Sequence, residues 1–278
     1  MILIDDPNDQ RIAPFRIRER GLNTRADRRE RVAAGLFVAE GDLVVARALQ
    51  AGCIAVTAFV DAAQPPPVID QFGPDVDVYG ADQDVRREGM GLGVPLSIVA
   101  LFRRPAPVRA AEVANRFRVV ALEAVDNPVN VGTVVRSASA LGWDGLLLDR
   151  TSADPLARRA LRVAMGNAFA FPFARVDSLA ATVAEARGRG TLVVALTPTA
   201  GSVPLHTVVA QKGQAVMLLL GSERGGLSEE LLDAASLRVS IPMASGVDSL
   251  NAAAAAAVAC YALRSQPPSS SARPDVSG

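Results

Sequence analysis

The chain has 278 residues, half of them hydrophobic, and 29 basic side chains balance 29 acidic ones to a formal net charge of zero. This composition supports a sizeable core and excludes global disorder, whereas the balanced charge argues neither for nor against a polyanionic partner. Two cysteines, Cys53 and Cys260, are too few for a disulfide framework or a zinc site. Cys260 follows an alanine-rich run and is expected to be a small core residue.

The N-terminus lacks the basic, apolar and small-residue progression of a signal peptide. The longest apolar run, Ala252–Leu263, has twelve residues and is too short to span a bilayer. We therefore expect a soluble, cytoplasmic protein.

The first thirty residues are polar and charged. Met1–Gln10 is acidic and is predicted to be a loosely held lead-in. Arg11–Arg31 carries eight arginines against three acidic residues, a local net charge of +5 (8 − 3), and has too few apolar residues to bury much.

A small α/β unit is predicted next, and we place the first domain at residues 1–107. From Leu36 the pattern indicates a strand that turns at Gly41 into an amphipathic helix. Short β-branched runs bounded by glycine and proline predict three further strands: Ile54–Val60, Val76–Tyr79 and Leu96–Phe102.

Strands and helices then alternate through residues 108–264, which predicts right-handed crossovers and a parallel sheet covered on both faces. The strands are expected at Val119–Glu123, Gly145–Leu148, Thr191–Leu196, Ala215–Leu220 and Leu237–Met243. The helices are expected before Leu141 and at Leu156–Met165, Leu179–Arg187 and Ala252–Leu263. The Ser/Pro-rich stretch 265–278 is predicted to be a disordered tail.

Polar residues follow several of these strands, and ligands of open α/β sheets bind at the carboxyl ends of strands. The candidates are Asn130, Arg136, Glu223, Ser249 and Asn251. Each also has a structural interpretation: a helix cap for the asparagines and the serine, a solvated helix face for Arg136, a surface turn for Glu223. His206 is the only histidine and lies in a predicted loop, so Ser-His-Asp and Cys-His mechanisms are disfavoured. Metal-ligand spacings are absent as well.

Three stretches together resemble the motifs of the SpoU/TrmH family of RNA ribose 2′-O-methyltransferases, in the SPOUT superfamily. The first runs from Asp126-Asn-Pro-Val-Asn130 to Arg136, and the second is Leu220-Gly-Ser-Glu223-Arg-Gly-Gly226. The third is Ile241-Pro-Met followed by Asp248-Ser-Leu-Asn251 and an alanine run. Their order, spacing and strand-loop-helix contexts fit the family across 118–263.

The resemblance implies a trefoil-knotted α/β methyltransferase domain with a parallel sheet, a homodimer, and S-adenosylmethionine held at the knot. Backbone of the strand-end loops would bind the cofactor: Leu196, Thr197, Pro198, Leu220, Gly221, Ile241, Met243 and Leu250. Arg136 falls on the family's arginine that is thought to activate the 2′-hydroxyl with the adjacent phosphate. A guanidinium is ordinarily protonated, so orienting the hydroxyl and phosphate is the easier role. Asn130, Glu223, Ser249 and Asn251 would organise the site.

Leu36–Asp42 resembles, more weakly, the small RNA-binding domain of rRNA-directed members. The Arg11–Arg31 segment would then contact phosphates, with a solvated, ion-paired helix as the alternative. We expect an RNA 2′-O-methyltransferase acting on ribosomal RNA. Transfer RNA is the rival substrate, a resistance-type rRNA methylase is a narrower variant, and a non-catalytic RNA-binding or ribosome-assembly factor is the rival function.

Overall fold

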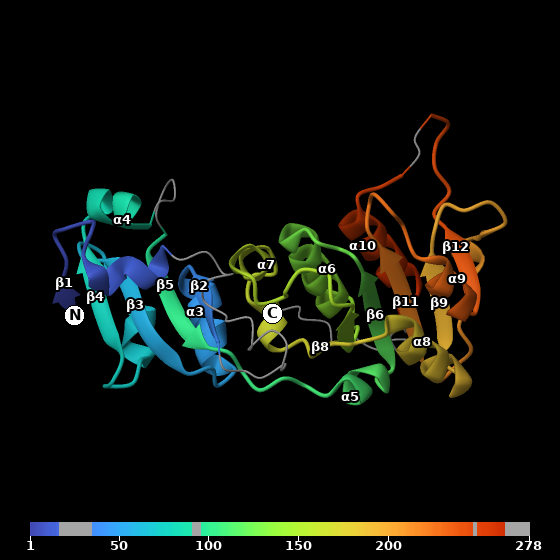
Figure 1. Cartoon of the computed structure of the whole chain (residues 1–278), viewed down its shortest axis with the longest axis horizontal. Helices are drawn as coiled ribbons and strands as arrows, with labels where there is room; N and C mark the ends of the chain where they lie inside the picture. Colours follow the sequence, from blue (N-terminus) through green and yellow to red (C-terminus); the bar gives the residue numbers. More distant parts are fainter. Residues whose placement is uncertain (17–34, 91–95, 247–248, 265–278) are drawn as a thin grey trace, which may run out of the picture.

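The computed structural model describes residues 1–16, 35–90, 96–246 and 249–264. Two β-sheets lie at opposite ends of an elongated molecule, and helices α3 (Asp42–Gln50) and α7 (Arg158–Val163) lie between them (Figure 1). We call residues 1–103 the N-terminal unit and residues 110–264 the C-terminal unit. None of the described helices is long and apolar enough to cross a bilayer.

The N-terminal unit is a five-stranded mixed sheet in the order β1-β4-β3-β5-β2. Its strands are β1 (Ile2–Leu3), β2 (Leu36–Glu40), β3 (Ala55–Asp61), β4 (Asp77–Ala81) and β5 (Ile98–Arg103). Strand β5 runs antiparallel to both β2 and β3, and the other pairs are parallel. The predicted strand, glycine turn and helix from Leu36 are confirmed, because Gly41 (φ 82°) is the residue before α3. Helix α4 (Gln83–Met90) was not predicted.

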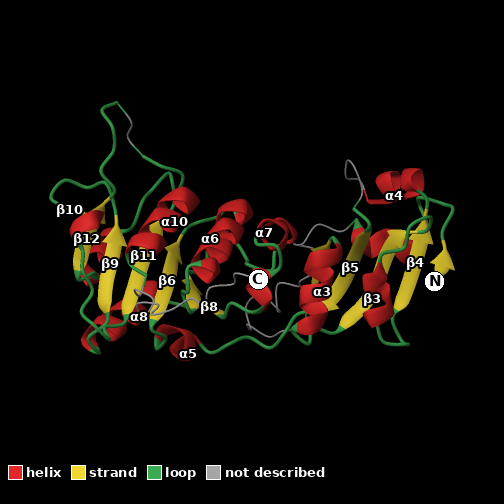
Figure 2. Ribbon diagram, turned by 180° about the vertical axis from the view of Figure 1, so that it is seen from behind, coloured by secondary structure: helices red, strands yellow, loops and turns green. Residues whose placement is uncertain are grey.

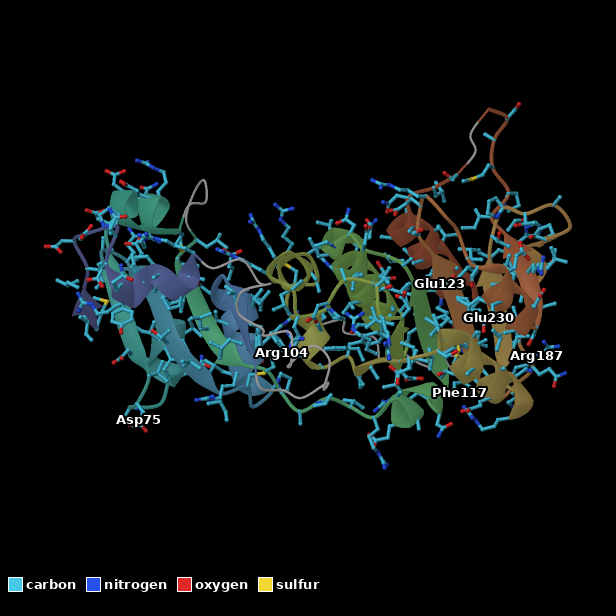
Figure 3. The ribbon with its side chains drawn as sticks, viewed as in Figure 1. Asp75, Arg104, Phe117, Glu123, Arg187 and Glu230 are labelled. Carbon is cyan, nitrogen blue, oxygen red and sulfur yellow. The ribbon has the colours of Figure 1, made fainter. Side chains whose placement is uncertain are left out.

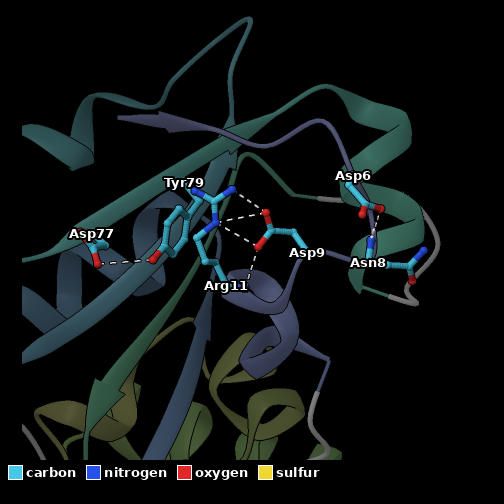
Figure 4. A network of polar contacts seen from close by, with 6 residues as sticks. All are labelled: Asp6, Asn8, Asp9, Arg11, Asp77 and Tyr79. Atoms are coloured by element: carbon cyan, nitrogen blue, oxygen red, sulfur yellow. Dashed lines mark hydrogen bonds and ion pairs between the residues drawn. The ribbon is translucent and has the colours of Figure 1, made fainter.

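The N-terminus is not the loose lead-in that its charge suggested. Strand β1 pairs with β4, and the 3₁₀ helix η1 (Gln10–Phe15) buries Ile12 and Phe15 completely against the sheet. Arg11 donates to both carboxylate oxygens of Asp9, at 3.0 Å to Oδ1 and 2.5 Å to Oδ2, and lies over the ring of Tyr79 (Figure 4). The hydrogen bonds from Arg11 lower the pKa of Asp9 to about 2.

The C-terminal unit is a seven-stranded sheet in the order β10-β12-β9-β11-β6-β7-β8, and all of its pairings are parallel. Its strands are β6 (Arg118–Glu123), β7 (Gly145–Leu148), β8 (Phe173–Arg175), β9 (Leu192–Leu196), β10 (Val203–Pro204), β11 (Val216–Gly221) and β12 (Leu237–Ser240). The predicted α/β class with a parallel sheet is therefore confirmed. The short edge strands β8 and β10 have no clear sequence signal and were missed.

Helices cover both faces of this sheet, which makes three layers (Figure 2). One face packs against α6 (Pro128–Ala140), α7 and α10 (Ala252–Ala262), and the other against α5 (Ala110–Ala114), α8 (Leu179–Gly188) and α9 (Glu229–Ala234). Strand β6 shows why its run is continuously apolar: Val120 and Leu122 face the first layer, whereas Val119 and Ala121 face the second.

Two predicted elements are shorter than expected. The strand from Leu237 ends at Ser240, because Pro242 lacks the N–H that continued pairing needs. Helix α7 covers only Arg158–Val163, and the chain leaves it through Met165 and Gly166, both with positive φ. The predicted tail at 265–278 lies outside the described residues.

Helix α10 returns across the sheet after β12. Strand β12 lies beyond β9, yet α10 packs against β11 and α6, so the chain passes back over its neighbours. Two bonds anchor its C-terminal end: Trp143 Nε1 donates to Cys260 O at 3.0 Å, and Arg118 Nε to Leu263 O at 3.2 Å. Burial lowers the pKa of Arg118. The trefoil knot expected from the resemblance is compatible with this return and stays a prediction.

Candidate active site at the strand ends

The three motif loops follow β6, β11 and β12, which together with β9 form four neighbouring strands of the parallel sheet. Strand β11 lies between β6 and β9, with Leu220 opposite Leu122 and Leu219 opposite Ala195, and β12 pairs with the other side of β9. Because all four strands run parallel, their carboxyl ends meet at the same edge. Loops separated by about a hundred residues in sequence therefore become neighbours.

The first loop ends in the start of α6. Asn127 is the N-cap residue, since its Oδ1 accepts from Val129 N at 2.9 Å, and Pro128 occupies the first helical position. Asn130 is therefore free of the capping role that a lone asparagine at a helix start suggested. It lies in the first turn, only 5% exposed, and points its amide toward the second loop.

The second loop is a tight turn that begins at Gly221. A Cβ at Gly221 would lie 2.0 Å from Gly226 O and 2.5 Å from Leu227 N, so only glycine allows the chain to fold back so closely. Gly226 N donates to Ser222 O at 2.9 Å, which closes the turn, and Glu223 lies inside it. This is a more specific structure than the simple surface turn considered from sequence.

The loop is also fixed beyond the turn. Ser228, the N-cap of α9, donates from both its backbone N and its Oγ to the carboxylate of Glu123, at 2.7 and 2.8 Å. Glu123 is the last residue of β6 (Figure 3), so the second loop is tied directly to the strand that carries the first.

Asn251 joins the three loops. Its Oδ1 accepts from Ala253 N and Ala254 N at 3.0 and 3.3 Å and so caps α10. Its Nδ2 donates at 3.1 Å to Asn130 Oδ1 and at 3.1 Å to Glu223 Oε1. Asn130 Nδ2 donates to Glu223 Oε1 as well, which closes a triangle of three side chains. The capping and functional interpretations of Asn251 therefore both hold, on different atoms.

This triangle lies in a pocket of about 260 Å³. Five of the lining residues were not among the predicted site residues: Ala124, Asp126, Asn127, Ser222 and Arg224. Ala124 has φ 53°, a conformation that residues other than glycine rarely adopt. The Asn-Pro pair at 127–128 was a readable helix-start signal, whereas nothing in the sequence marks the strained alanine.

Two of the five candidate catalytic residues are not in contact with this triangle. Arg136 is exposed, and its Nη1 donates to Val163 O at 3.4 Å. It lies six residues beyond Asn130, which places it about 9 Å farther along α6 and on a different face. Ser249 is exposed in the third loop.

The predicted cofactor residues gather at the ends of β9, β11 and β12. Thr197 N donates to Val239 O at 2.8 Å, which holds the β9 loop against β12, and Thr197 Oγ1 lies 2.7 Å from Thr199 Oγ1. Leu196 and Gly221 are the last residues of β9 and β11, and Leu220 is buried. Pro198 lies in the loop after β9, and Ile241 follows β12. Leu250 is 38% exposed and precedes Asn251, the N-cap of α10. Within the described part of the chain, the backbone N–H groups of Met243 and Leu250 donate to no other residue. Backbone N–H groups beside apolar side chains fit the adenosine moiety that these loops are expected to bind.

Comparison with known proteins agrees with this architecture. The model of the SpoU rRNA Methylase family matches residues 118–261. An uncharacterized tRNA/rRNA methyltransferase of Mycobacterium tuberculosis is 35% identical over 261 residues, covering 92% of this chain and 89% of that protein. The 23S rRNA (guanosine(2553)-2′-O)-methyltransferase RlmP of Bacillus subtilis is 27% identical, with coverage of 85% and 92%.

A solved structure shares the whole fold. The AdoMet-bound rRNA methyltransferase from Sinorhizobium meliloti superposes with a TM-score of 0.77 at 28% identity, covering 94% of this chain and 96% of that one. The parallel sheet and its three motif loops thus define an α/β protein of the RNA methyltransferase class. The chain belongs to the SpoU rRNA Methylase family.

Proposed function

We propose that this protein transfers a methyl group from S-adenosylmethionine to a ribose 2′-hydroxyl of ribosomal RNA. The observation that carries the proposal is the hydrogen-bonded triangle of Asn130, Glu223 and Asn251, which joins the three motif loops at the carboxyl edge of the sheet. A protein that only bound RNA would not need these three side chains to close on one another.

The cofactor would lie along the ends of β9, β11 and β12, against the backbone of Leu196–Pro198, Leu220–Gly221, Ile241, Met243 and Leu250. When bound, S-adenosylmethionine supplies the electrophilic methyl group. The triangle of amide and carboxylate groups sets the spacing between the loops, and this spacing fixes how the ribose approaches. We propose that Ser249, which is exposed in the third loop, contacts the incoming nucleotide.

Arg136 is proposed to orient the RNA rather than to remove the proton itself. Its guanidinium is exposed, and fork-like donors suit a phosphate or a ribose hydroxyl beside it. The prediction is that Arg136→Ala abolishes methyl transfer and leaves cofactor binding largely intact. Loss of cofactor binding together with activity would assign Arg136 a structural role instead.

We propose that residues 1–107 select the RNA and residues 108–264 carry the chemistry. RlmP acts on 23S rRNA and the Sinorhizobium meliloti protein is described as an rRNA methyltransferase, which supports ribosomal over transfer RNA. The arginine-rich segment contributes little to this argument. Of its eight arginines, Arg11 and Arg16 are described, and they bind Asp9 and Gly89 O within the chain. The other six lie outside the described residues.

We also propose a homodimer, supported by an apolar stripe on α10. Ala254, Val258 and Tyr261 recur at helical spacing and are exposed, with Val258 44% and Tyr261 60% accessible. An exposed apolar stripe beside the active site suits a second copy of the chain. Light scattering should give twice the monomer mass for the wild type and the monomer mass for Val258→Asp; a monomeric wild type would refute the dimer.

The reaction is tested by incubating the protein with labelled S-adenosylmethionine and total RNA that lacks this protein's own modification. A labelled 2′-O-methylnucleoside in ribosomal RNA is the expected product. Label in transfer RNA would change the substrate class. Cofactor binding without transfer would point to a ribosomal particle as the substrate. If the cofactor does not bind at all, the non-catalytic assembly factor is favoured.

A further inference from the structure

The turn that follows α7 accepts hydrogen bonds from Arg47, a side chain of the N-terminal unit. Arg47, on α3, donates from Nη1 to Met165 O and to Asn167 Oδ1, both at 2.6 Å. Met165 has φ 53°, an unusual conformation for a residue with a side chain, and its carbonyl is one of the two acceptors. The arginine therefore stabilises a turn that the local sequence does not favour by itself.

Backbone packing at this point is close as well. A Cβ on Gly166 (φ 77°) would lie 3.2 Å from Arg47 Cβ and 3.4 Å from Val44 Cα. The other end of α7 is also held by the N-terminal unit, where Arg158 donates to the buried carboxylate of Glu40. Helix α7 is thus fixed at both ends by the neighbouring unit, and one hydrophobic core runs through the junction.

Helix α7 also accepts a hydrogen bond from Arg136, which lies on the neighbouring helix α6. A Cβ on Gly132 would lie 2.4 Å from Ala160 O and 2.8 Å from Ala160 Cα, so α6 and α7 are in direct backbone contact. One turn farther along α6, Arg136 Nη1 donates to Val163 O, the last carbonyl of α7. The carbonyls at a helix C-terminus have no partner within the helix and can accept such a donor.

We propose that Arg47 is a positioning residue for Arg136. By fixing the turn after α7, Arg47 fixes Val163 O, and this acceptor limits the conformations of an otherwise exposed guanidinium. The seating of the N-terminal unit would then set the geometry of the residue that orients the RNA. This inference rests on the proposed role of Arg136 in methyl transfer.

A matched control crosses the same junction. Arg104, which is labelled in Figure 3, directly follows the N-terminal unit. Its Nη2 lies 2.5 Å from Oδ2 of Asp154 in the C-terminal unit, in a partly buried ion pair. Among the described residues, no hydrogen bond or ion pair joins Arg104 to the turn after α7 or to Arg136. Arg104→Ala therefore removes one arginine at the junction of the two units and leaves the hydrogen bonds of Arg47 to the turn after α7 unchanged.

The experiment compares full-length wild type, Arg47→Ala, Arg47→Lys and Arg104→Ala. For Arg47→Ala we expect kcat for methyl transfer to unmodified ribosomal RNA to fall about tenfold to a hundredfold, because catalysis is sensitive to misplacement by an ångström. The KM for RNA and the Kd for S-adenosylmethionine should change little. Arg47→Lys, whose single ammonium can still reach one acceptor, should recover part of kcat, and Arg104→Ala should keep it.

Hydrogen–deuterium exchange gives a readout independent of activity. The amides of Gly166 and Asn167 donate to Leu161 O and Ala164 O within the turn, at 3.0 Å each, and should exchange faster in Arg47→Ala but not in Arg104→Ala. Unchanged kcat or unchanged exchange in Arg47→Ala would overturn the inference, as would equal losses in both alanine variants. A wild type without methyl transfer would refute the proposed function, while the exchange data would still decide whether Arg47 holds the turn.

Discussion

Asn251 is the residue whose replacement tests the site most directly, because it caps α10 and joins the three loops. Asn251→Ala removes the acceptor for Ala253 N and Ala254 N, which costs about 1 kcal/mol. It also leaves Oδ1 of the buried Asn130 without its 3.1 Å donor, at a cost of about 1–3 kcal/mol. Since Asn251 is itself exposed, water compensates part of this loss.

We therefore expect Asn251→Ala to lower the unfolding free energy by about 2 kcal/mol, which corresponds to a fall in Tm of roughly 4–8 °C. Asn251→Asp separates the two roles of the side chain. Aspartate caps a helix as well as asparagine does but cannot donate to Asn130, and it places a second carboxylate beside Glu223. Both variants should lose methyl transfer.

The pH dependence of Asn251→Asp has a definite sign. Two adjacent carboxylates repel each other when both are ionised, so the folded variant binds a proton more readily than the unfolded chain does. Its Tm deficit relative to wild type should therefore be smaller at pH 5 than at pH 8, as measured by calorimetry in matched buffers. The reasoning is refuted if Asn251→Ala melts within about 1 °C of wild type, well below the shift that loss of the cap alone predicts, or methylates at the wild-type rate.

Three further predictions concern other parts of the C-terminal unit. Gly132→Ala drives a methyl group into the backbone of Ala160 and should destabilise the protein by about 1–3 kcal/mol in chemical denaturation; wild-type stability would contradict the contact between α6 and α7. Arg159 and Arg162 are exposed on α7 and form no ion pair within the described residues, so their double alanine variant should lower the salt slope of RNA binding by about 2 in a titration from low to moderate salt. An unchanged slope would show that these two arginines of α7 do not contact RNA phosphates. Burial raises the pKa of Cys260 to about 12, so iodoacetamide at pH 8 should leave this thiol unlabelled until the protein unfolds; rapid labelling of the native protein would show that the α10 core opens.

The main features of the C-terminal unit could be read from its sequence. The apolar runs of β6 and β11 are uninterrupted. The local sequence is therefore enough to predict two buried strands. The alanine-rich helix α10 and the Asn-Pro start of α6 are equally local signals. The order of the three motifs was sufficient to indicate the family before any contact between them was known.

Other features depend on neighbours that the local sequence does not reveal. Ile12 and Phe15 bound a four-residue apolar run in an otherwise charged stretch, and they become core only because the sheet of β3, β4 and β5 offers them a face. The short strands β8 and β10 exist because longer strands beside them supply hydrogen-bond partners. In each case the stabilising contact is non-local, so the segment itself carries little pattern.

For the active site, too, some features were predictable from the sequence and others depend on the tertiary structure. Sequence alone selected Asn130, Glu223 and Asn251, because polar residues at strand ends in that order match one family. Only the tertiary structure brings them together, across separations of 93 and 121 residues, and lets both amides donate to the carboxylate of Glu223. The parallel sheet order makes their loops adjacent, and chain order cannot show this. The hydrogen bonds from Arg47 to the turn near Arg136 likewise depend on how the two units pack.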